Sequence, residues 1–288
     1  MIFLFWIDSG SSYRVVGSAF DTPRNTVCRI VHKYLKLFVK ILPEVIRRPS
    51  NETEIAAVSE GFKKLSKCNA FVKCLGAIDG SHIWMTAPKD LAGDYYNRKH
   101  KTTVQLQAIV DHRGLFLDIF CGFPGSVHDM RVLRHSTIYQ SGHFPPRNYF
   151  IIGDQGYRCI TNPLALISPY RTALTEQQLR FNNILSKARI IVEQAFGWLK
   201  GRWRCLHDSR LRVNYKKVPH VVSVCCILHN LCVLKDDLPP QEYYSDYDES
   251  EEYEAVEEIE GDVFLNSICN QITSAYNRYD EHNYLRKN

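Results

Sequence analysis

The apolar positions along this chain follow two different spacings. Residues 13–38, 52–66, 186–205 and 217–234 repeat apolar side chains at the spacing of amphipathic or buried helices. Residues 71–154 instead contain short apolar runs separated by polar or glycine-containing loops, which is the pattern of strands. The chain is therefore predicted to be an α/β protein, with helices before and after a strand-rich block.

Four strands are expected in that block. The first, residues 74–78, ends at Asp79, and residues 102–110 and 115–122 form a hairpin around a short turn that contains a glycine. After a polar loop and a short helix, a fourth strand ends just before Asp154. Antiparallel strands, a crossover, one more strand and later helices predict a ribonuclease-H-like mixed sheet flanked by helices.

Residues 1–43 are predicted to form part of a helix-turn-helix. A helix over residues 13–20 and a second over residues 23–38 would be joined by a short turn, and the second would carry polar side chains at its start, as a recognition helix does. Residues 1–10 look too short for a good third helix, so the module is expected to be incomplete. Two interpretations stay open, because the helical pair either reads DNA or packs on the main domain. Residues 44–70 are predicted to be a linker and one helix.

Charge separates the main domain, residues 71–235, from a tail at residues 236–288 that is predicted to be acidic and disordered. Residues 236–262 hold 13 of the 31 acidic residues and no lysine or arginine. The rest of the chain therefore holds all 36 basic residues and only 18 acidic ones. A basic body indicates a polyanion-binding surface. The acidic stretch then either competes for that surface or only raises solubility, and the sequence leaves both open.

The composition argues against a membrane protein or a disulfide-rich secreted protein. The opening apolar run is short and has no basic leader, and no apolar run reaches the length of a membrane span. The ten cysteines form no CxxC pair and lie mostly in apolar contexts. This favours free, buried cysteines in a reducing compartment over disulfides or a zinc site.

Three acidic residues are the main candidates for chemistry. Asp79 and Asp154 each follow an apolar run and have glycines beside them, and Glu193 lies in a helical pattern next to an apolar stripe. Three carboxylates from separate elements are suitable ligands for Mg²⁺ or Mn²⁺, and can hold two ions about 3.5–4 Å apart across a scissile phosphate. Taken alone, Glu193 with its basic neighbours is better explained as a surface ion-pair residue.

Further residues are candidates for supporting roles at this site. His128 and Asp129 form an auxiliary pair, and Asp129 is also a candidate fourth metal ligand. Basic side chains near the three acids are candidates for holding DNA phosphates, which would make binding strongly dependent on salt. They are Arg98, Lys99, Lys101, Arg189, Lys200, Arg202 and Arg204.

Five blocks of sequence, in a fixed order, resemble the PIF/Harbinger transposases and the nucleases derived from them. The blocks are GAIDGSHIWMTAP, YYNRKHKTTVQLQAIVDHRGLFLDIFCGFPGSVHDMRVL, GDQGY, VEQAFGWLKGRWRCL and CCILHN. The resemblance covers residues 71–234 and implies a ribonuclease-H-like DDE nuclease core with a divalent metal. It implies that Asp79, Asp154 and Glu193 are the first, second and third acids, and that Asp129 lies in a further family block.

The resemblance also implies partners and a location. Family members use DNA as substrate and a separate Myb-like protein for DNA binding and nuclear entry, so the chain is expected in the nucleus and cytoplasm. The leading hypothesis is a divalent-metal-dependent DNA endonuclease of the DDE transposase type, which hydrolyses phosphodiester bonds. The alternatives are a catalytically retired DNA- or protein-binding factor that keeps the transposase fold, and a pure adaptor protein.

Overall fold

A five-stranded mixed sheet forms the centre of the molecule. The computed structural model describes residues 1–87, 93–97, 100–172, 175–207, 211, 213–238, 266, 267 and 270. The strand order is β3–β2–β1–β4–β5, with β2 antiparallel to both β1 and β3, and β4 parallel to both β1 and β5. The strands are β1 (Cys74–Trp84), β2 (Thr103–Val110), β3 (Phe116–Pro124), β4 (Phe150–Ile152) and β5 (Leu166–Ile167). The predicted ribonuclease-H-like α/β fold is confirmed.

Strand β1 differs from its prediction in one important respect. It does not end at Asp79 but runs on to Trp84. The extension pairs with β2 along its whole length, from Asp79 opposite Ala108 to Trp84 opposite Thr103. Pairing with β2 provides hydrogen-bond partners for the backbone N–H and C=O groups in the polar half of β1. The strand therefore continues beyond the apolar run from which it was predicted.

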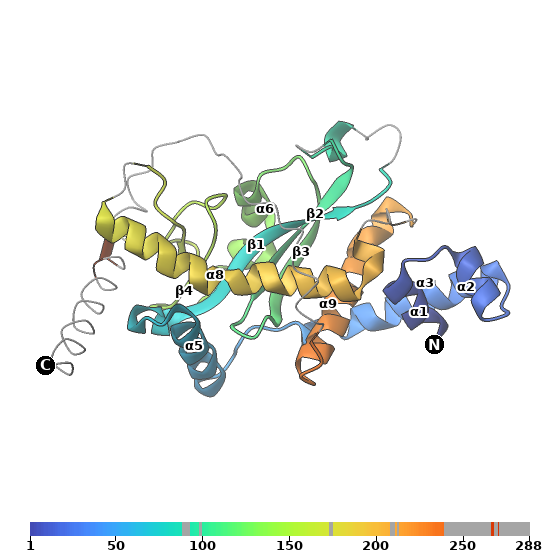
Figure 1. Cartoon of the computed structure of the whole chain (residues 1–288), viewed down its shortest axis with the longest axis horizontal. Coiled ribbons are helices and arrows are strands. Elements are labelled where there is room, and N and C mark those ends of the chain that lie inside the picture. The colour runs from blue at the N-terminus through green and yellow to red at the C-terminus, as the bar shows by residue number, and fades with distance from the viewer. Residues whose placement is uncertain are drawn as a thin grey trace, which may run out of the picture.

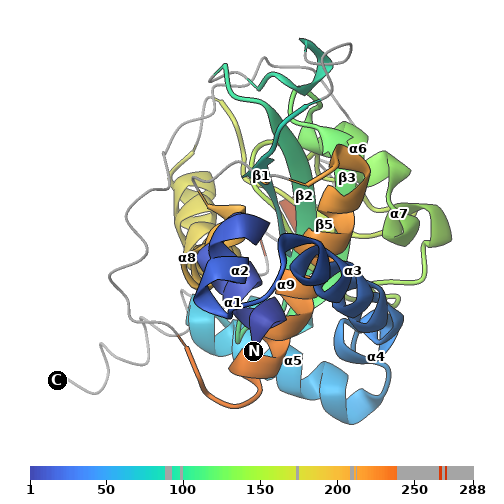
Figure 2. The ribbon, with the colours of Figure 1, turned by 90° about the vertical axis from the view of Figure 1, so that its right-hand side faces the viewer.

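Helices cover both faces of the sheet. In Figure 1, α8 crosses one face, and Figure 2 shows α6 and α7 on the opposite side of the sheet. Helix α9 packs against β3 and α8. The helices are α1 (Ile2–Ser9), α2 (Tyr13–Ala19), α3 (Arg24–Lys40), α4 (Leu42–Val45), α5 (Glu52–Ser66), α6 (Asp129–His135), α7 (Thr137–Ser141), α8 (Glu176–Arg202) and α9 (Val218–Val233), with 3₁₀ turns at η1 (Asn69–Lys73), η3 (Gly93–Tyr95), η4 (Arg204–Leu206) and η5 (Tyr215–Lys217).

The N-terminal segment contains three helices rather than the two that were expected. The expectation that residues 1–10 are too short for a helix is wrong, because α1 occupies Ile2–Ser9. Phe3, Trp6 and Ile7 are buried, and the ring of Phe3 stacks 5.5 Å from that of Phe38 on α3. An eight-residue helix is marginal in isolation, so burial of this apolar face is what stabilises it. The three helices lie together at one end of the molecule (Figure 1).

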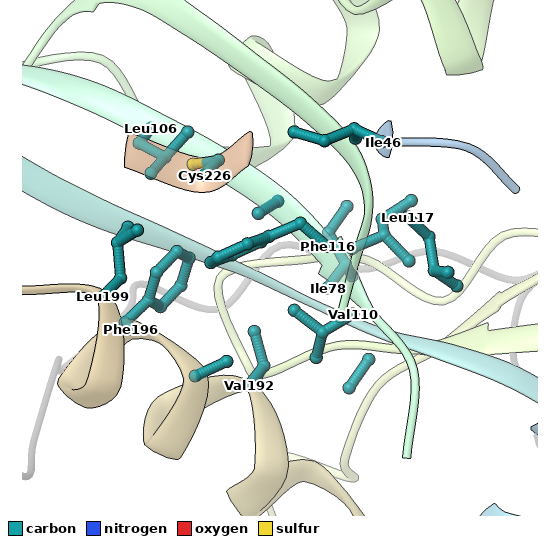
Figure 3. Close-up of a cluster of buried hydrophobic side chains, with 14 of the residues drawn as sticks. Ile46, Ile78, Leu106, Val110, Phe116, Leu117, Val192, Phe196, Leu199 and Cys226 are labelled. Atoms are coloured by element: carbon teal, nitrogen blue, oxygen red, sulfur yellow. The ribbon is translucent and has the colours of Figure 1, made fainter. Parts of the chain in front are cut away.

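Helix α8 carries much of the core. It begins at Glu176, ten residues before the predicted start, because Thr175 and Gln178 form a capping box. Figure 3 shows Val192, Phe196 and Leu199 pointing from α8 towards side chains of the sheet. All three are at most 1% exposed. Their burial fixes the rotation of α8, and therefore the direction in which its polar face points.

Helix α9 is buried nearly all round, as its sequence indicates. Its Asn230 accepts a hydrogen bond from the Phe116 backbone N–H and donates one to the Phe116 carbonyl, both at 2.8 Å. This amide holds α9 on the end of β3 without an unsatisfied buried group. Within the described ranges, no helix has the combination of length and apolar character that crossing a bilayer requires. Most of the predicted acidic tail, residues 239–265, 268, 269 and 271–288, lies outside the described residues.

Candidate active site

The two strand aspartates meet at the middle of the sheet. Strands β1 and β4 run parallel with Ala77 opposite Ile152, and each aspartate lies two residues beyond its member of that pair. Asp79 is therefore inside β1, while Asp154 follows the end of β4 at the same level. The short β4 leaves the edge of β1 unpaired there, and so the Asp154 loop can lie beside Asp79.

Glu193 is connected to Asp79 through an arginine. Arg189, one turn earlier on α8, has its Nη2 atom 2.7 Å from Glu193 Oε1 and its Nη1 atom 3.5 Å from Asp79 Oδ2. The side chains of Arg189 and Asp79 are 15% and 16% exposed, whereas Glu193 is 39% exposed. The guanidinium thus bridges the helix-borne acid to the sheet-borne acid in a largely buried position.

Burial makes both aspartates weaker acids than usual, and neighbouring negative charge adds to this effect at Asp79. Burial, together with the nearby charges of Asp154 and Glu193, raises the pKa of Asp79 to about 8, although Arg189 and a 2.7 Å hydrogen bond from the Gly80 N–H oppose the rise. Burial also raises the pKa of Asp154, and Arg189 and backbone N–H groups oppose that rise. Crowded, desolvated carboxylates of this kind are stabilised by a cation that binds between them.

The raised pKa of Asp79 predicts a pH-dependent stability. Between about pH 4, where an unfolded aspartate ionises, and about pH 8, folded Asp79 holds a proton that the unfolded chain has released. The free energy of unfolding should therefore fall as the pH rises through this window. We expect Asp79→Asn to make the fall shallower, measured by urea unfolding in EDTA at several pH values.

Asp118 provides a matched control for that measurement. Burial raises its pKa to about 6, so Asp118→Asn should change the slope below about pH 6 and leave it unchanged above. Parallel curves for the wild type and Asp79→Asn between about pH 6 and 8 would show that Asp79 ionises normally in the folded protein.

Asp129 approaches β1 from the other side of the sheet. It begins α6, and its carboxylate accepts a hydrogen bond from Gln105 Nε2 on β2. A Cβ atom at Gly80 would collide with this carboxylate, so the close approach requires glycine at that position. Successive side chains on a strand point to opposite faces, which places Asp129 across β1 from the Asp79 carboxylate. His128 is exposed at the N-cap of α6.

Tyr157 and two glutamines form a buried polar layer on that second face. Tyr157 is fully buried, and its hydroxyl lies 3.4 Å from Gln107 Oε1. Burial and the charges of Asp129, Asp79 and Asp154 raise the pKa of Tyr157 well above its usual value, so the phenol stays neutral among these acids. Sequence reasoning assigned no role to these residues. The available signal was two glutamines, Gln105 and Gln107, at alternate positions of an otherwise apolar strand.

Residues 78–230 match the family described as DDE superfamily endonuclease. The matched stretch runs from β1 to α9, is longer than half of the 288 residues, and contains Asp79, Asp154 and Glu193. The chain belongs to this family. The PIF/Harbinger resemblance is thereby confirmed, and the sheet with its acids is the nuclease-type core of a DDE endonuclease family member.

Curated relatives of this DDE family member come from plants and vertebrates. A protein of Arabidopsis thaliana named "Protein ALP1-like" is 29% identical over 250 residues, covering 80% of this chain and 59% of the relative. The human protein named "Putative nuclease HARBI1" is 27% identical over 228 residues, covering 77% of this chain and 63% of the relative. A Xenopus laevis protein of the same name is 24% identical over 270 residues, covering 92% of this chain and 76% of the relative. The chain thus spans about three fifths of the length of the first two relatives. No solved structure matches it.

The donor atoms of this DDE site have the chemistry that a hard divalent cation prefers. All three candidate ligands are carboxylates, and burial raises the pKa values of two of them, Asp79 and Asp154. However, no group of three or more His, Cys, Asp or Glu side chains in the described part of the chain is arranged to hold a metal ion. The Arg189 guanidinium bridges Asp79 and Glu193.

The basic residues expected to hold phosphate have diverse environments. Arg202 is bound through two hydrogen bonds, of 2.7 and 2.9 Å, to the carboxylate of Asp237 just beyond α9. Lys101 is exposed, and its Nζ lies 3.9 Å from the centre of the Trp84 ring. Two of the seven lie outside the described residues, namely Arg98 and Lys99.

Lys200 and Arg204 lie near the C-terminal end of α8. Lys200 is half-buried, and burial lowers its pKa to about 8. Arg204 is exposed in η4. Arg189 is paired with two acids. Among the five members of the set that the structure describes, the exposed ones are therefore Lys101 and Arg204.

Proposed function

We propose that this chain is a divalent-metal-dependent endonuclease that hydrolyses phosphodiester bonds of DNA. The observation that supports it most directly is the placement of Asp79 and Asp154 at adjacent parallel strands, with Glu193 linked to Asp79 through Arg189. Membership of the DDE endonuclease family supports the same class of reaction.

In this proposal the three acids hold the metal, and the rest of the site keeps them in place. When bound, the cation supplies a water of lowered pKa and neutralises charge on the leaving 3′ oxygen. Asp79 is fixed by the β1–β2 ladder, and Asp154 by a 3.0 Å hydrogen bond from the Gly156 N–H. Glu193 is positioned by the packing of α8, whose apolar side chains face the sheet (Figure 3).

A manganese titration tests the proposal directly. The full chain, with a short DNA duplex present, would be compared with the Asp79→Asn/Asp154→Asn double variant by calorimetry. We expect the wild type to bind Mn²⁺ saturably and the double variant to lose this binding. The reason is that each of the two substitutions replaces a carboxylate with an amide and so removes an anionic oxygen donor. Asp118→Asn, a half-buried aspartate on β3, is the matched control and should bind as the wild type does.

Equal Mn²⁺ binding by the wild type and the double variant, or none by either, would contradict the metal site. Salt-sensitive duplex binding without cleavage would then favour a catalytically retired DNA-binding factor, and absence of duplex binding would favour an adaptor. Nuclear entry with a Myb-like partner, which the family resemblance implies, stays a prediction.

A further inference from the structure

Arg189 occupies an unusual position for a residue expected to bind DNA. Its guanidinium is directed into the acid cluster, where one nitrogen contacts Glu193 and another contacts Asp79. Its side chain is only 15% exposed, about as buried as Asp79 itself. A phosphate of the DNA backbone therefore does not meet this guanidinium in the described arrangement.

The contacts of Arg189 are made to the same oxygen atoms that a metal would need. Asp79 Oδ2 and Glu193 Oε1 are the acceptors, and both belong to proposed metal ligands. Guanidinium is permanently charged, and its planar fork suits two carboxylates at once. Without a cation, the acids would repel each other in a largely buried place, so the guanidinium relieves the repulsion that a divalent ion would otherwise relieve.

We infer that Arg189 is a built-in counter-ion that fills the cation position of the metal-free acid site and competes with the divalent metal. The inference rests on the proposed metal site. Metal binding requires the contact between the Arg189 guanidinium and the Asp79 carboxylate to break. The displaced guanidinium then becomes available to a phosphate of bound DNA. Arg189 would thus keep the acids together when no metal is bound, and its competition would lower the affinity of the site for the divalent metal.

The test is the Mn²⁺ affinity of Arg189→Gln, measured by calorimetry at about pH 8.5, above the pKa of Asp79. We expect the variant to bind Mn²⁺ about tenfold more tightly or better, since loss of one close competing charge is worth at least about one factor of ten. In EDTA its melting temperature should be lower than that of the wild type, and Mn²⁺ should raise it by more than it raises the wild-type value.

Two further variants make the result specific. Arg180→Gln removes another arginine of α8, which pairs with Glu176 at 2.9 Å in an exposed position, and should leave Mn²⁺ affinity unchanged. Arg189→Lys keeps the charge but loses the fork, so it should fold and bind Mn²⁺ more tightly than the wild type by a smaller factor.

The outcomes separate this inference from the proposed function. If the wild type binds Mn²⁺ and both Arg189 variants bind it equally or more weakly, Arg189 is a structural clamp and the inference is overturned. If none of the proteins binds Mn²⁺, the metal site fails and the inference fails with it. Binding by Arg189→Gln that the wild type lacks would support the inference.

Discussion

Asp154→Asn is expected to lose metal-dependent nicking of duplex DNA while the protein stays folded. Losing a residue that only supports a metal ligand commonly costs 10- to 100-fold, so losing a ligand should cost roughly 1,000-fold or more. The fold should survive because asparagine keeps the oxygen that accepts the 3.0 Å hydrogen bond from the Gly156 N–H. The measurement is conversion of supercoiled plasmid to nicked circles in Mg²⁺ or Mn²⁺.

The matched control is again Asp118→Asn, because Asp118 is also a half-buried aspartate with a raised pKa but lies on β3. It should nick at the wild-type rate. Nicking by Asp154→Asn at that rate, with the fold verified by its melting curve, would remove Asp154 from the active site.

Val192→Asp is expected to unfold the nuclease core. Val192 is fully buried on the face of α8 that points to the sheet (Figure 3). An uncompensated charge in such a position costs roughly 3–5 kcal/mol, against a total stability of about 5–15 kcal/mol for a typical domain. We expect a loss of the cooperative urea transition or a large shift of its midpoint, and little soluble protein on expression.

Ile190→Asp makes the same chemical change two residues away, on a side of α8 where the side chain is 48% exposed. Its effect on stability should be small. A soluble, cooperatively folding Val192→Asp protein would mean that α8 has a different rotation, and the placement of Glu193 one residue later would be wrong as well.

Most of the secondary structure could be predicted because local periodicity and burial agree. The apolar stripe of α8 depends only on which face of the helix meets the core, so the sequence pattern is sufficient. The alternation in β2 also predicted a strand, although both of its faces are buried. The predicted start of α8 was late although the capping residues Thr175 and Gln178 are visible in the sequence. The helix α1 was missed because its stability comes from packing on α3, which no local pattern records.

The sequence by itself determined the family and the α/β class and named three candidate acids, since these depend on residue types in a fixed order. Only the tertiary structure decided what surrounds them. Strand β1 continues past Asp79, and Asp129 lies on the opposite face of the sheet, next to Gly80. Arg189, expected to hold a DNA phosphate, instead contacts the carboxylates of Asp79 and Glu193. The reason is that strand pairing and helix rotation bring together residues more than a hundred positions apart, such as Asp79 and Arg189, and charge interactions depend on that distance in space.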